Sequence, residues 1–167
     1  MTKLPDYLIK SVALAALSGS RSFLGMSLVS FMLSRNPSRK LQRSHLPFKY
    51  LQLPAVTNTL AVLTVAEMAG DKLPFTPNRT DALPLAGRFV FGAVTTATLL
   101  KARGGNAVTG MILGGACALT AAFASFYLRK AITGPKVNNI VAGLIEDVIL
   151  LGIGMTIISR IGSKEIK

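Results

Sequence analysis

The chain has 167 residues, of which half are hydrophobic and only 16% are charged, and it carries a formal net charge of +12. Soluble domains rarely combine so apolar a composition with so few charged residues. A soluble chain of this length also cannot surround several fully apolar helices with amphipathic ones. The composition therefore favours a membrane protein over a soluble domain.

Five apolar runs, each about 17 to 26 residues long, match the roughly 20 residues that a membrane-spanning helix needs. They predict an all-α fold, a polytopic membrane helix bundle of about five transmembrane helices, in a single integral-membrane domain over residues 1–167. The lipid bilayer is then the first partner of the chain. The runs are Leu8–Leu33, Leu53–Ala69, Leu83–Leu100, Ala107–Leu128 and Asn139–Ile161.

The first run follows Lys3 and Lys10, as the apolar part of a secretory signal would. A signal's apolar region stops after about 7 to 15 residues, whereas this one resumes after Arg21. We therefore expect the segment to stay in the protein as a helix. A break at Gly19 and Ser20 would instead make it a re-entrant pair and would reverse the sidedness of everything downstream.

The loop after the first run, residues 35–49, contains five basic residues, His45 and no acidic residue. Cytoplasmic loops keep an excess of lysine and arginine, so a topology signal is the simplest interpretation. Recognition of anionic lipid headgroups is the functional alternative. If all five runs span, this side receives ten basic residues and the other side seven, which predicts an outside N-terminus and a cytoplasmic C-terminus. Basic residues divided between two faces do not predict nucleic-acid binding.

An acidic pair, Glu67 and Asp71, lies at the end of the second run. Residues four apart share one face of a helix, and two carboxylates in a poorly solvated site form a candidate proton or cation binder. Lys72 could neutralise one of them. Asp71, Lys72 and Arg79 also fit a cluster at the membrane interface, so Glu67, one turn deeper, is the stronger candidate.

Small residues repeat at four-residue spacing along the fourth run, at Gly110, Gly114 and Ala118. Such spacing lets helix backbones approach closely. The face formed by these residues could pack within the chain or join a second copy in a homo-oligomer.

A second acidic pair, Glu146 and Asp147, lies about eight residues into the last run, near mid-depth. Adjacent helical residues point about 100° apart, so the two carboxylates cannot face one partner. Arg21 and Arg88 are the natural counter-charges. Both arginines lie between small residues and a following phenylalanine, in GSRSFLG and AGRFVFG, a likeness that suggests internal duplication.

These charges form the predicted functional site. A charge near the bilayer centre costs roughly 2.5 to 3.5 kcal/mol, so buried charges imply pairing or a polar cavity. A sealed cluster would favour a scaffold, and a cluster open to water would favour a conduit. The predicted site consists of Arg21, Glu67, Asp71, Arg88, Glu146 and Asp147.

Several motifs resemble a bacterial integral-membrane family known only as a domain of unknown function. The motifs are GSRSF at 19–23, EMAGDKLPF at 67–75, PNR at 77–79, AGR at 86–88 and IED at 145–147. The resemblance spans most of the chain and implies a small multi-helix membrane domain, in the bacterial inner membrane, with no assigned activity. A fainter likeness is to polyprenyl-diphosphate phosphatases, of whose arginine motif only Ser20, Arg21 and Ser22 are reproduced.

Three function classes remain open. The first is a transporter or channel-like protein that handles an ion, a proton or a small solute. The second is a non-catalytic scaffold or assembly partner, whose ion pairs fix helix registry. The third is a lipid-phosphate hydrolase or transferase. One histidine and one cysteine do not support a haem or zinc site, so no cofactor, metal or catalytic residue is predicted, and an enzyme is the less favoured class.

Overall fold

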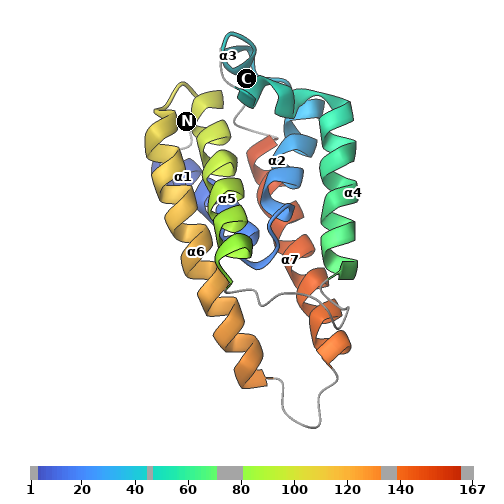
Figure 1. Ribbon diagram of the computed structural model, residues 1–167. Helices are drawn as coiled ribbons and strands as arrows, with labels where there is room; N and C mark the ends of the chain where they lie inside the picture. Colours follow the sequence, from blue (N-terminus) through green and yellow to red (C-terminus); the bar gives the residue numbers. More distant parts are fainter. Residues whose placement is uncertain (1–3, 45–46, 71–80, 133–138, 163–167) are drawn as a thin grey trace.

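The computed structural model describes residues 4–44, 47–70, 81–132 and 139–162, and in these residues the fold is all-α (Figure 1). This confirms the predicted fold class. The helices are α1 (Leu4–Ser20), α2 (Leu24–Arg35), α3 (Arg39–Gln42), the 3-10 helix η1 (Pro47–Gln52), α4 (Pro54–Gly70), α5 (Ala82–Ala102), α6 (Ala107–Ile132) and α7 (Asn139–Gly162).

The first apolar run forms two helices and not one, because the chain turns between Ser20 and Leu24 and α2 runs back along α1 (Figure 1). The close approach depends on Gly25, where a Cβ atom would overlap the Leu14 carbonyl oxygen and the Ser18 hydroxyl. The break that Gly19 and Ser20 suggested is therefore present. We call residues 19–23 the tip of the α1–α2 hairpin.

The hairpin forms the centre of the bundle. Its first helix, α1, packs on α5 and α6, and its second helix, α2, packs on α4, α5 and α7. Large apolar side chains of both helices, such as Leu14, Leu24 and Leu33, are completely or almost completely buried. The remaining long helices therefore surround a central hairpin, and the hydrophobic core lies along it.

The outer helices expose large apolar side chains. Helices α5, α6 and α7 are each long and apolar enough to cross a membrane. Several of their large apolar side chains are at least half exposed, among them Leu144, Val148 and Ile149 on α7 and Ile112 and Leu128 on α6. A soluble bundle would turn such side chains inward, so this apolar outer surface agrees with a helix bundle of the membrane type.

The turn at the tip changes the sidedness expected for five separate spans. Helix α1 begins and α7 ends at the same end of the bundle (Figure 1), so the prediction of termini on opposite sides is wrong. We call this the basic end, because most basic residues of the described chain lie there. They are Arg35 at the end of α2, Arg39, Lys40 and Arg43 in and just after α3, Lys49 in η1, Lys101 and Arg103 at the end of α5, and Arg160 in the last turn of α7. Arg129 and Lys130 lie in the last turn of α6, toward the opposite end.

Two residues of the basic loop form hydrogen bonds to the bundle. The Ser38 hydroxyl donates to the Ala102 carbonyl at 3.0 Å, and the Lys40 ammonium donates to the Arg103 carbonyl at 2.8 Å. These two contacts join the loop to the C-terminal end of α5. Lys40 therefore has a structural contact in addition to any role in topology.

Candidate functional site

The tip of the hairpin lies near the middle of the bundle's height. Gly19 packs so closely on α6 that a Cβ atom there would overlap the Ala118 carbonyl oxygen. Ala118 is eleven residues after Ala107, the first residue of α6, which corresponds to about 16 Å along the helix. Since a bilayer's hydrocarbon core is about 30 Å thick, this contact places the tip near mid-depth of a membrane that α6 would cross.

An ion pair between Arg21 and Asp147 joins the tip to α7. The guanidinium Nε and Nη2 atoms of Arg21 both lie 2.7 Å from Oδ1 of Asp147. The Arg21 side chain is 1% exposed and the Asp147 side chain 7% exposed. The predicted counter-charge pairing is therefore present for these two residues, and the pair is sealed from the surroundings.

Glu67 binds the tip by a different interaction from the one predicted. Its Oε1 accepts the backbone N–H of Ser22 at 2.8 Å, and its Oε2 accepts that of Phe23 at 3.1 Å. These N–H groups precede α2, whose first turn has no partners within the helix. The carboxylate thus binds the positive, N-terminal end of the α2 dipole. The sequence had predicted that it would pair with an arginine side chain. Glu67 itself is only half-buried.

We expect Glu67→Ala to lower the free energy of unfolding by about 1 to 2 kcal/mol, because two backbone N–H groups lose their acceptor. Glu67→Gln keeps one carbonyl oxygen and should cost less than the alanine variant. Chemical unfolding in one detergent measures both. Thr59→Ala on the exposed side of α4 is the control, and equal losses in all three variants would contradict a capping role for Glu67.

The neighbour of Asp147 has a separate partner. Oε2 of Glu146 lies 3.5 Å from Nη1 of Arg129 on α6, and both side chains are about one-fifth exposed. The 100° offset between the adjacent carboxylates is therefore confirmed, since one faces the hairpin and the other faces α6. Sequence reasoning missed Arg129. Arg129 lies three residues before the end of α6, and Glu146 lies seven residues after the start of α7. A basic residue near the end of one apolar run and an acidic residue near the start of the next is the signal that could have found this pair.

The second predicted arginine, Arg88, lies in the same layer as the tip. Arg88 is 3% exposed and lies in α5, one turn before Phe91. The Phe91 ring packs on the Phe23 ring of the tip with centroids 4.5 Å apart. Arg21 lies in a turn whereas Arg88 lies within a continuous helix, so the similar sequences around the two arginines do not form similar local structures.

The small residues of α6 pack within the chain. A Cβ atom at Gly110 would crowd the backbone of Ala97, and one at Gly114 would overlap the Gly92 carbonyl, both on α5. Ala118 is fully buried between Gly19 and Gly92. The face predicted for a homo-oligomer is thus covered by α1 and α5, and a second copy could use it only if that packing opened.

The remaining predicted residues Asp71, Lys72 and Arg79, and also His45, lie outside the described residues. Among the described ones, no group of three or more histidine, cysteine or acidic side chains could hold a metal ion. The site that the structure assembles is therefore the hairpin tip with one sealed ion pair, Arg21–Asp147, and one half-buried carboxylate, Glu67.

The tip therefore combines two kinds of charge compensation. The Arg21 guanidinium is neutralised by the Asp147 carboxylate, and the backbone N–H groups at the start of α2 are capped by the Glu67 carboxylate.

A family model described as a domain of unknown function (DUF4126) matches residues 8–159. The match covers all or most of every helix described above, including the hairpin tip, the Glu67 end of α4 and the ion pair on α7. No curated protein and no solved structure matches the chain.

Proposed function

We propose that this chain, which belongs to the DUF4126 family of unknown function, is a small membrane transporter or channel that passes a proton or a small anionic solute at the hairpin tip. The membrane would be the cell membrane, and in a bacterium the inner membrane. All residues, 1–167, would form one integral-membrane domain. The basic end would face the cytoplasm, because cytoplasmic ends keep the excess of lysine and arginine.

The observation that carries the proposal is the position of Glu67. A half-buried carboxylate lies on the N-terminus of a broken helix near mid-depth. Broken helices whose N-termini meet anionic groups near the membrane midplane are a recurrent arrangement in transporters. Ionisable groups at such depth are costly unless they serve a pathway or pair with one another. Glu67 therefore supports exchange of a proton or an anion more directly than any other described residue does.

Flux through proteoliposomes tests this proposal. We expect the parent protein to pass protons, chloride or phosphate down an imposed gradient faster than protein-free liposomes, and Glu67→Gln to reduce that flux at least about tenfold. Asp6→Asn, an exposed carboxylate in the first turn of α1, is the matched control and should retain the parent's rate. No flux in the parent under any of these gradients would contradict the proposal.

A scaffold is the second candidate, and the sealed Arg21–Asp147 pair is the observation that favours it. An ion pair excluded from the surroundings can fix the registry of the hairpin against α7 without any solute. A scaffold predicts a stoichiometric partner in mild-detergent pull-downs and no flux. The lipid-phosphate enzyme is not favoured, because the Arg21 guanidinium that would bind phosphate is engaged by Asp147.

A further inference from the structure

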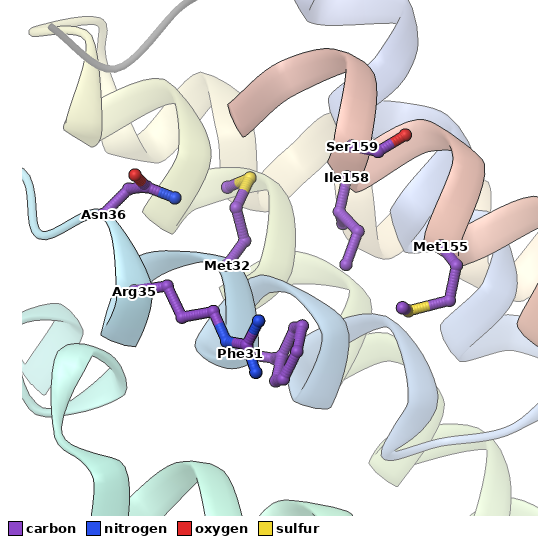
Figure 2. Close-up of a pocket in the computed structure, with 7 residues that line it drawn as sticks. All are labelled: Phe31, Met32, Arg35, Asn36, Met155, Ile158 and Ser159. Carbon is purple, nitrogen blue, oxygen red and sulfur yellow. The ribbon is translucent and has the colours of Figure 1, made fainter. Parts of the chain in front are cut away.

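A groove opens between α2 and α7 at the basic end, away from the hairpin tip (Figure 2). Its volume is about 370 Å³, within the range of ligand pockets. Its lining divides into two parts. Phe31, Met32, Met155 and Ile158 are apolar, whereas Arg35, Asn36 and Ser159 are polar.

The polar part of the groove lies where the helices leave the apolar layer. Arg35 is the last residue of α2, and Ser159 lies two residues before the end of the α7 span at Ile161. The apolar lining belongs mainly to the preceding turns, toward the middle of the bundle. An occupant must therefore place a polar group at the membrane surface and an apolar group in the hydrocarbon layer.

The charge of the groove determines the sign of that polar group. The Arg35 guanidinium lies 4.3 Å from the centre of the Phe31 ring, which holds it at the groove (Figure 2). Arg35 is exposed, and the lining contains no carboxylate. A guanidinium in this position can bind two oxygens of one phosphate group.

We propose that this groove binds one anionic phospholipid, with its phosphate on Arg35 and the start of an acyl chain between Phe31 and Met155. The bilayer supplies this ligand in excess, and the match of charge, apolar lining and depth selects it over a soluble phosphate. The proposal is independent of the transport proposed above, because the groove contains none of the charged residues of the hairpin tip.

Lipid titration of the purified full chain in detergent, followed by native mass spectrometry, tests the groove. We expect the parent to retain dioleoylphosphatidylglycerol at least about tenfold more tightly than dioleoylphosphatidylcholine. Arg35→Gln should lose about tenfold in affinity for the anionic lipid. Arg43→Gln, also at the basic end but outside the lining, should lose at most about fivefold, the general effect of one basic residue near a membrane surface.

A second pair of variants distinguishes lipid binding in the groove from general electrostatic attraction of anionic lipid to the basic end. Met155→Trp fills the apolar part without changing any charge and should weaken retention of the anionic lipid at least fivefold. Ile153→Trp is its control, since both parent side chains are 48% exposed on α7 but only Met155 lines the groove. Equal losses for Arg35→Gln and Arg43→Gln, with parent-like binding by Met155→Trp, would overturn the proposal. Binding of inorganic phosphate as tight as that of the lipid would also overturn it.

Discussion

Replacing Asp147 by asparagine is expected to lower the free energy of unfolding by about 3 to 5 kcal/mol, because it leaves the buried Arg21 guanidinium without its counter-charge. Both Nε and Nη2 of Arg21 are 2.7 Å from one Asp147 oxygen, and the two side chains are almost fully buried. An asparagine oxygen can still accept a hydrogen bond, but it carries no negative charge. The loss should therefore approach that of other buried pairs from which one partner is removed.

The adjacent residue supplies the control for this experiment. Glu146→Gln breaks the 3.5 Å pair with Arg129, but those side chains are partly exposed, so we expect a loss of at most about 1 kcal/mol. Unfolding by denaturant in one detergent, followed by helical circular dichroism, compares the two variants. Equal losses would contradict the sealed pair. The double variant Arg21→Met with Asp147→Leu should recover most of the stability that Asp147→Asn loses.

Gly19→Ala is expected to have the second largest effect, a loss of about 1 to 3 kcal/mol or more, because the added methyl group must enter occupied space. Its Cβ atom would overlap the Ala118 carbonyl oxygen, and it would lie only 2.7 Å from the Ala121 Cβ and 2.9 Å from the Ala122 nitrogen. Two of these atoms are backbone and cannot move aside as a flexible side chain can. Helix α1 would have to separate from α6.

The expected sign reverses at a glycine with open surroundings. Gly152 in α7 has no atom within 4 Å of a Cβ position, so Gly152→Ala should stabilise the helix by up to about 1 kcal/mol. The same unfolding measurement serves for both glycine variants. Destabilisation by Gly152→Ala as large as that by Gly19→Ala would show that the close contact with α6 is not the cause.

Together these variants test whether the tip acts as the junction of the bundle. Within five residues, Gly19 contacts α6, Arg21 binds α7, and Ser22 and Phe23 bind Glu67 of α4. A displacement of the tip would therefore change the contacts of three helices at once.

The helices themselves could be predicted from the sequence. The fourth and fifth apolar runs, Ala107–Leu128 and Asn139–Ile161, begin at the first residues of α6 and α7 and end within a few residues of their last ones. Length and hydropathy are local properties that each segment carries alone. The break in the first run was visible too, because Gly19 and Ser20 interrupt an otherwise continuous apolar segment.

The ionisable residues of the site were also visible, since a charge within an apolar run is costly wherever the run packs. Which of the candidate counter-charges pair, and what Glu67 binds, could not be predicted. Arg21 and Asp147 are 126 positions apart, and Glu67 binds backbone groups that no side-chain pattern can indicate. Only the return of α2 along α1 places the tip between α4, α6 and α7, and with it sets the sidedness of the termini. The sequence thus determined which segments form helices and which charges need compensation, whereas the tertiary structure decided what compensates them, because pairing depends on contacts between helices that are distant in the chain.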